Sequence, residues 1–507
     1  MEALLGPLLH GFAIALTPSN LLAGLIGCIV GTIIGILPGL GPTASIALLL
    51  PVTVGMNPLA GIIMLAGVYY GAMYGGSTTS ILVNIPGEAA SVVTCIDGYQ
   101  MALQGRAGPA LGISAIGSFI GGTISVVAVM LISPVLADTA VKFGPPEKFA
   151  LFFFAFTLIG YLAGESMVRG LLMGVLGLLL GSVGADDFYG TDRFVFGSLY
   201  LRDGIGLVPL AMGVFGLGEI LYNIERRAKQ ASVMETPKSL LPTLQDWWDS
   251  FWPIVRGTGI GLGIGILPGG MPAVSSLVSY AVEKRLAKHP EQFGKGAIQG
   301  VAGPETANNA ATGGGFVPLL TLGIPTNSVL ALLLAALMLH GVTPGPLLLV
   351  RFPDVFWGVI ASMYIGNVVL LILNLPMIGV FVQILKIPYT LLSPLIVLFV
   401  LLGAYSLNNN ATDVLATILF GILGYLMKRF RFEAAPLVLA FVLGPMMETS
   451  FRQSLVMSRG GSLTIFLTRP ISGTLLVIGM LVLVFPLVKQ RIARLLQRAV
   501  RGSDRAE

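Results

Sequence analysis

The chain has 507 residues, of which 55% are hydrophobic and only 10% are charged. Soluble domains carry about a quarter charged residues, so this composition excludes an ordinary soluble protein and indicates an integral membrane protein. The net charge of +5 does not predict a nucleic-acid partner, because the basic residues occur in short loops and in the C-terminal tail. Apolar segments of about 17–25 residues suit helices that cross a lipid bilayer.

The first half begins with residues 1–16, which are short for a span and are expected at the membrane interface. A span to Leu37 is expected to turn at Pro38–Gly41 and to return through 43–50. Another span, at 57–75, is expected to precede a short helix that Ser77–Ser80 cap and that stops at Asn84. Residues 88–106 are too polar to span and are placed along the membrane surface, with Glu88 and Asp97 as solvated charges. Further apolar segments follow at 109–136, 148–163, 166–184 and 205–224.

The second half follows a polar linker at 225–250. It contains a broken apolar segment, a short helix to Tyr280, and spans expected near 328–343, 354–376, 388–406, 411–428 and 435–450. We therefore divide the chain into a first membrane repeat (1–224), a cytoplasmic linker (225–250), a second repeat (251–450), an additional C-terminal span (451–488) and a basic cytoplasmic tail (489–507). The predicted fold class is an all-α polytopic membrane protein with about 10–14 membrane segments.

The division into repeats rests on a duplicated motif. Gly35–Gly39 and Gly265–Gly269 have the same sequence, Gly-Ile-Leu-Pro-Gly, at an offset of 230 residues. At an offset of 239 residues, Gly75-Gly76 and Ile85-Pro86 recur as Gly314-Gly315 and Ile324-Pro325. Both halves thus contain two interrupted helices in the same order. Paired interrupted helices in two halves of a membrane protein are typical of a transporter substrate site.

Loop charges predict that the repeats are inverted. The first motif is followed by the uncharged stretch 51–57, whereas the second is followed by the charged stretch 283–289. Because Lys and Arg favour the cytoplasmic side, the two stretches are expected on opposite faces of the membrane. The linker and the tail are expected in the cytoplasm, and the acidic loop that contains Asp186 is expected outside.

The helix starts at Pro42 and Pro272 are expected to present free N–H groups to an anion. No Lys or Arg falls within the four motif elements, so backbone N–H groups and hydroxyls are expected to hold a carboxylate. The alternative is that Gly and Pro only kink packed helices. The expected substrate-binding residues are Pro38, Gly39, Pro42, Thr43, Ser45, Ser77, Thr78, Thr79, Pro268, Gly269, Pro272, Ser275, Thr326 and Asn327. Valine at Gly39 or Gly269 is expected to block transport, whereas Gly121 in an unbroken span is expected to tolerate it.

Glu305 is the most conspicuous ionisable residue of the motifs. An ionisable group at membrane depth is costly, which predicts a site for a coupling ion, Na⁺ or H⁺, with Asn308 and Asn309 as further ligands. The alternative is a helix-cap carboxylate near the aqueous edge. Tyr69 is interpreted as a packing residue. No catalytic residues, no metal site and no other cofactor are expected, because the sequence shows no nucleophile–base pair, metal-ligand cluster or phosphate-binding loop.

Four motifs resemble the large membrane subunit of the tripartite tricarboxylate transporters, the TctA family. They are GILPGLGPTASIALLLP, YYGAMYGGSTTSILVNIPGEA, GPETANNAATGGGFVPLLTLGIP and HGVTPGPLL. The resemblance implies a permease of the bacterial inner membrane that works with a small membrane subunit and a periplasmic solute-binding protein. It also implies ion-driven uptake (symport) of di- or tricarboxylates or related organic acids. The alternative function is a passive organic-anion channel, and a membrane enzyme is a less favoured one.

Overall fold

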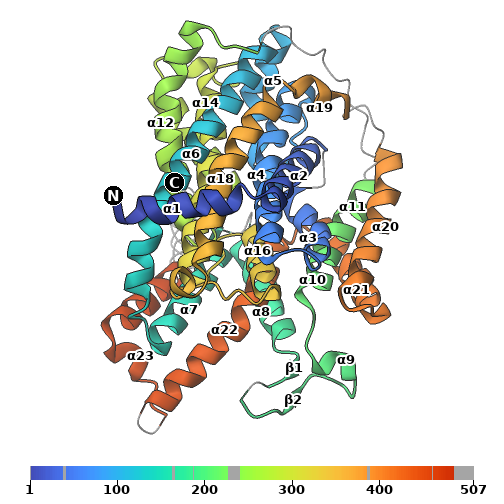
Figure 1. The fold of residues 1–507 in the computed structure, drawn as a ribbon, viewed down its shortest axis with the longest axis vertical. Coiled ribbons are helices and arrows are strands. Elements are labelled where there is room, and N and C mark those ends of the chain that lie inside the picture. Colours follow the sequence, from blue (N-terminus) through green and yellow to red (C-terminus); the bar gives the residue numbers. More distant parts are fainter. Residues whose placement is uncertain are drawn as a thin grey trace, which may run out of the picture.

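The computed structural model describes residues 2–37, 41–162, 166–186, 188–225, 240–384, 389–458 and 461–484. These residues fold into a bundle of helices with a small antiparallel hairpin, β1 (Gly184–Ala185) and β2 (Asp192–Arg193), at one end (Figure 1). The expectation of an all-α membrane protein is therefore confirmed at the level of fold class.

The first half begins with α1, Glu2–Ala15, which runs across the bundle and packs against α18 (Figure 1). The next elements are α2 (Pro18–Ile36), α3 (Gly41–Thr53), α4 (Pro58–Val83), η1 (Ala89–Val92), α5 (Thr94–Leu103), α6 (Ala107–Ala140), α7 (Pro145–Leu162) and α8 (Met167–Gly181). After the hairpin come α9 (Leu199–Arg202), α10 (Leu207–Ala211), the π-helical η2 (Met212–Leu217) and α11 (Gly218–Glu225).

The second half begins with α12 at Leu244, inside the stretch assigned to the linker, where Thr243 and Asp246 form a capping box. Its elements are α12 (Leu244–Ile266), α13 (Pro272–Leu286), η3 (Pro290–Gln292), α14 (Gln299–Gly314), α15 (Phe316–Leu322), α16 (Ser328–Leu339), α17 (Leu348–Arg351), α18 (Pro353–Asn374), α19 (Ile378–Ile384), α20 (Tyr389–Asn408), α21 (Ala411–Arg429), α22 (Ala435–Met457) and α23 (Ile465–Thr468).

Within the described ranges, seven helices are long and apolar enough to cross a membrane: Pro18–Ile36, Pro58–Val83, Ala107–Ala140, Leu207–Glu225, Pro353–Asn374, Leu391–Asn408 and Ala411–Arg429. Shorter apolar helices lie at Leu4–Ala15, Gly41–Thr53, Met167–Gly181, Ser328–Leu339 and Pro470–Val484. Their length and composition indicate a multi-pass membrane protein.

Proline determines where several of these helices begin. Pro58 and Pro272 occupy the first turns of α4 and α13, where the missing N–H of proline costs nothing. Asn57 caps α4 by accepting a hydrogen bond from the N–H of Leu59 at 3.0 Å. The predicted restarts after the Pro-Gly motifs are thus helix starts.

The duplicated sequence produces the same helix packing twice. In α2, a methyl group on Gly27, Gly31 or Gly35 would overlap the carbonyl oxygens of Met64, Val68 and Ala72 of α4. In α12, a methyl group on Gly257, Gly261 or Gly265 would overlap those of Gly303, Ala307 and Ala311 of α14. The glycines of α2 and α12 are separated by 230 residues, and the carbonyl groups of α4 and α14 by 239 residues. These are the same two offsets that separate the duplicated motifs. Small residues let helix backbones approach closely in membranes, so each pair depends on its glycine row.

Both repeats also end the second helix in the same way. Asn84 after α4 and Gly323 after α15 adopt left-handed conformations, with φ of 57° and 68°. The halves differ at the predicted interruption, because α4 continues through Gly76 to Val83, whereas its counterpart separates into α14 and α15 at Gly315. The expectation that Ser77–Ser80 cap a new helix is therefore wrong. The inversion of the second repeat stays a prediction.

The largest hydrophobic cluster lies where α4, α16 and α18 meet, around Leu65, Leu333 and Phe356. Two charges expected in solvent are buried instead. Asp97 of α5 is 0% exposed, because its Oδ1 accepts hydrogen bonds from the N–H groups of Gly294, Gly296 and Ala297. Glu88 is 7% exposed. The segment 88–106 was assigned to the surface for its polarity, but tertiary hydrogen bonds allow its charges to be enclosed.

Gly121 is also tightly packed. A side chain at this position would overlap the carbonyl oxygen of Thr306. The expectation that Gly121 tolerates valine is therefore wrong, because an unbroken helix can still require glycine at a contact with another helix.

The glycine rows make a prediction about stability. Gly265→Ala should lower the free energy of unfolding by about 1–3 kcal/mol, because the added methyl group meets the backbone of Ala311. Gly263→Ala is the matched control on the same helix, with no atom within 4 Å of the added carbon, and it should leave stability unchanged or raise it. Thermal unfolding in one detergent measures both. Equal unfolding temperatures for the two variants would contradict the close contact between Gly265 of α12 and Ala311 of α14.

Candidate functional site

A cavity of about 360 Å³ lies where the starts of three helices meet. Pro42 and Thr43 of α3, Pro272 and Ala273 of α13, and Ser328 of α16 line it. The first N–H groups of an α-helix have no acceptor within the helix, and the helix dipole makes this end positive. The cavity therefore offers donors and positive potential from both halves of the chain. Of the expected substrate residues, Pro42, Thr43, Pro272 and Asn327 line this cavity.

Hydrogen bonds join the two halves around this cavity. The hydroxyl oxygens of Thr43 and Ser328 lie 3.1 Å apart. The side-chain N–H of Asn327 donates to the phenolic oxygen of Tyr69 at 3.0 Å, while its Oδ1 accepts from the N–H of Leu330. Tyr69 also lines the cavity, so its interpretation as a packing residue alone is incomplete.

The second Pro-Gly turn lies next to two of the helix starts that line the cavity. Gly269 has a φ of +80°, and its N–H donates to the carbonyl oxygen of Thr326 at 2.9 Å. Pro268 and Gly269 are not among the residues that line the cavity; they link the start of α13 to the loop before α16. The equivalent Pro38 and Gly39 lie outside the described residues.

The other expected hydroxyl residues brace the helix starts. Ser45 donates to the carbonyl oxygen of Gly41 at 2.8 Å. Ser275 donates to the carbonyl oxygens of Pro272 and Ala307 at 2.7 and 3.1 Å. Thr326 is fully buried, and its hydroxyl has no hydrogen-bond partner. None of these three lines the cavity in the described part of the chain.

Ser77, Thr78 and Thr79 belong to a different polar cluster, inside α4. All three are buried, and Thr79 donates to the carbonyl oxygen of Gly76 at 3.0 Å. Ser77 donates to Oε2 of Glu305, which is 0% exposed. The structure thus places Ser77 beside the expected ion site, and none of the three is among the residues that line the cavity.

Glu305 lies in the middle of α14 with polar groups on both carboxylate oxygens. Oε1 accepts from the hydroxyl of Thr94, and Oε2 accepts from Ser77 and, at 3.2 Å, from Nδ2 of Asn308. Asn309 contacts the backbone oxygen of Glu305 at 3.2 Å and the hydroxyl of Ser118 at 2.8 Å. The alternative of a helix cap at the aqueous edge is wrong, because Glu305 is fully enclosed. The hydroxyl and amide oxygens around it are hard ligands suited to a small cation.

Sequence reasoning missed the charged residues of the cavity. Lys428, in the last turn of α21, and Glu219, in α11, line it and form an ion pair. The Nζ of Lys428 also lies 5.2 Å from the ring centroid of Tyr222. The expectation that this region lacks a fixed cation is therefore wrong. No motif marks these residues, because Lys428 lies at the end of an ordinary apolar helix and Glu219 lies within another.

Glu88 contributes a second carboxyl group to the cavity. Its Oε2 accepts a hydrogen bond from the N–H of Ala90 at 2.6 Å, whereas its buried Oε1 has no partner. Glu88 precedes η1 and lies outside the spanning helices. Burial raises the pKa of Glu88 to about 8, and the charge of Glu305 acts in the same direction, while the Ala90 N–H stabilises the ionised form.

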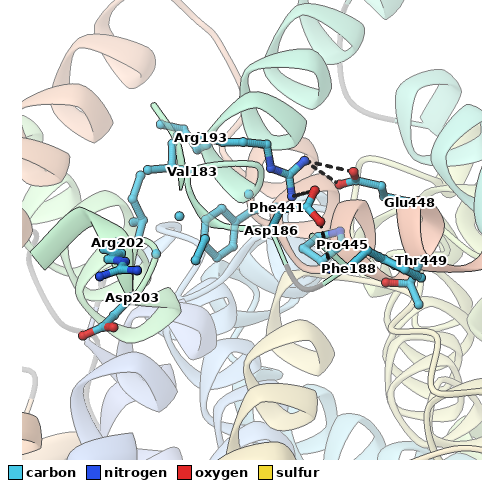
Figure 2. A pocket seen from close by; sticks show the side chains of 16 residues that line it. Val183, Asp186, Phe188, Arg193, Arg202, Asp203, Phe441, Pro445, Glu448 and Thr449 are labelled. Atoms are coloured by element: carbon cyan, nitrogen blue, oxygen red, sulfur yellow. Dashed lines mark hydrogen bonds and ion pairs between the residues drawn. The ribbon is translucent and has the colours of Figure 1, made fainter. Parts of the chain in front are cut away.

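Another cavity, of about 280 Å³, lies between the β1–β2 hairpin and α22 (Figure 2). Three charged groups of its lining, Asp186, Arg193 and Glu448, pair with one another. Arg193 of β2 points to Glu448 of α22 at 2.9 Å (Figure 2), and Arg452 bonds Asp186 at 2.9 Å. These ion pairs hold the hairpin against the bundle. In the part of the chain that the structure describes, none of the expected site residues lines this cavity.

Comparisons with known proteins agree with the motifs. The profile of the "Tripartite tricarboxylate transporter TctA family" matches residues 21–439. An Agrobacterium vitis protein, "Uncharacterized 52.8 kDa protein in TAR-I ttuC' 3'region", is 49% identical over 488 residues, covering 96% of this chain and 97% of the relative.

A second Agrobacterium vitis protein, "Uncharacterized protein in TAR-II ttuC' 3'region", is 52% identical over 225 residues, covering 44% of this chain and 93% of the relative. No solved structure matches the chain significantly. The family match extends from α2 into α22 and contains both duplicated motifs, the cavity and Glu305. The chain is therefore a member of the tripartite tricarboxylate transporter TctA family, a family of membrane transport proteins.

Proposed function

We propose that the cavity at the starts of α3, α13 and α16 binds an organic carboxylate, and that the protein imports it across the bacterial inner membrane. One observation carries this proposal: helix N-termini from both halves of the chain line the same cavity, and Lys428 lines it too. A helix N-terminus is equivalent to roughly half a positive charge, and each contributes about 0.3–1 kcal/mol to the binding of an anion, more when it is partly buried.

Lys428 extends this site to substrates with more than one carboxylate. Its ammonium group pairs with Glu219. A second carboxylate of the substrate can take the place of Glu219, while the first contacts the N–H groups of α3 and α13. A di- or tricarboxylate fits these separated positive groups better than a monocarboxylate does.

The remaining parts of the transport system follow from family membership and are proposed on that ground. A small membrane subunit and a periplasmic solute-binding protein act as partners, and an ion gradient, of Na⁺ or H⁺, drives uptake. Glu305, with Asn308 and Asn309, is the proposed ion site. α4 connects this site to the cavity, because its Tyr69 lines the cavity and its Ser77 bonds Glu305.

The first test measures uptake of labelled citrate, succinate and acetate into cells that express the chain and its partners. Lys428→Gln should weaken the apparent affinity for the favoured polycarboxylate by about 10- to 100-fold, because a charge-assisted hydrogen bond is worth roughly 1.5–3 kcal/mol. Arg429→Gln is the control, since Arg429 pairs with Glu225 outside the cavity. Equal affinities in the two variants would remove Lys428 from the site. Uptake that never exceeds the external concentration would favour the passive channel.

The Pro-Gly turn gives a second prediction. Gly269→Val should abolish uptake at normal expression, because a β-branched residue is strained at a φ of +80° and the bond to Thr326 would be displaced. Gly259→Val in α12 is the control, as no atom lies within 4 Å of its added carbon. Substrate uptake and membrane abundance are measured together. Wild-type uptake by Gly269→Val would show that the turn does not position the site.

The ion site gives a third prediction. Glu305→Gln should raise the Na⁺ or H⁺ concentration needed for half-maximal uptake by about 5- to 150-fold, because the loss of one ligand charge costs on the order of 1–3 kcal/mol. Glu225→Gln, at an exposed ion pair, should leave it unchanged. The measurement is uptake as a function of each ion. An unaltered ion dependence in Glu305→Gln would assign Glu305 a purely structural role.

A further inference from the structure

Glu88 combines two features that conflict if it is ionised. It lies in the wall of a cavity built for anions, and it is 93% enclosed, with 7% of its surface exposed. Its Oε1 has no hydrogen-bond partner among the residues that the structure describes. An unpaired buried carboxylate oxygen is costly, and a substrate carboxylate in the same cavity would add like-charge repulsion.

Among the described residues, the elements packed against Glu88 supply no cation for that oxygen. η1 packs against α4, α5, α13 and α14. The titratable groups that interact with Glu88 from these elements are Tyr69 of α4 and Glu305 of α14. The Cys95 thiol of α5 interacts with Glu305, and α13 adds the uncharged Pro272 and Ala273 to the cavity. Lys428 lines the same cavity, but it is paired with Glu219.

Glu305 lies beside the same turn of α4 as Glu88. A side chain on Gly76 would touch Cγ of Glu88, and the next residue, Ser77, donates to Glu305. Two enclosed carboxyl groups beside one turn disfavour simultaneous ionisation, since each charge raises the pKa of the other. Glu305 has donors for both its oxygens, so the proton belongs on Glu88.

We propose that Glu88 is a protonation site coupled to substrate binding, so that a carboxylate and a proton occupy the cavity together. The proposal rests on the proposed carboxylate transport. The neutral carboxyl group keeps its bond from Ala90 through Oε2, and the proton on Oε1 is donated in a hydrogen bond to the substrate carboxylate. Repulsion is thereby replaced by a charge-assisted hydrogen bond. This proton accompanies the substrate whichever ion binds at Glu305.

The test uses the purified full chain with citrate, succinate and acetate as probes, and measures thermal stabilisation between about pH 7 and pH 9. Affinity of the wild type should fall about tenfold per pH unit once Glu88 ionises. Glu88→Gln mimics the protonated form, so its affinity should change less than about twofold over this range. Glu219→Gln removes the other carboxyl group of the cavity, and Glu225→Gln is a surface control; both should keep the wild-type pH dependence.

Infrared difference spectra separate this proposal from the proposed function. A protonated-carboxyl band should disappear as pH rises in the wild type and should be missing from Glu88→Gln but present in Glu225→Gln. If no carboxylate stabilises the wild type while the band behaves in this way, the carboxylate site is wrong and the protonation of Glu88 stands. Retained pH dependence in Glu88→Gln, or its loss in Glu219→Gln, would overturn the role of Glu88.

Discussion

Interrupted helices impose one requirement on which the rest of this structure depends. Each break exposes backbone N–H groups, and in lipid such groups must meet protein, water or a ligand. The chain meets this requirement by bringing the starts of α3, α13 and α16 to one cavity. The N–H groups that have no acceptor within the helices are the groups that can bind an anion. The same unpaired N–H groups therefore make the breaks costly in lipid and support the proposed anion binding.

The glycine rows make that arrangement rigid. α2 and α12 each lie directly on the backbone of a second helix, α4 and α14 respectively. Close backbone contact fixes the ends of α2 and α12 against these partners, and α3 and α13 also pack against α4 and α14. The starts of α3 and α13 are thus held relative to α4 and α14, which carry Tyr69 and Glu305. Tyr69 of the proposed substrate cavity and Glu305 of the proposed ion site thus lie on the two helices that the glycine rows contact.

Charge is distributed unevenly around this framework. The helix starts are positive without carrying a charged side chain, and Lys428 is already engaged by Glu219. Two carboxyl groups, Glu88 and Glu305, lie beside the same turn of α4. Glu88 lines the proposed anion cavity, and Glu305 lies close to it. Because these carboxylates would repel an anionic substrate, tight binding requires accompanying cations or protons. Such an arrangement ties the binding of an anion to the binding of positive charge.

The sequence by itself determined the membrane class, the helix starts at Pro42 and Pro272, the internal duplication and the importance of Glu305. These features are local, because hydropathy, proline geometry and repeated motifs are read within a short window. Only the tertiary structure decided which residues share the cavity. Lys428 and Glu219 lie in ordinary apolar helices and come to the same cavity as Pro42 through the packing of α11 and α21. The hydroxyl of Ser77 bonds Glu305, because α4 continues unbroken past Gly76. Glu88 and Asp97 were expected in solvent because their segment is polar, yet burial depends on distant partners that no local pattern contains.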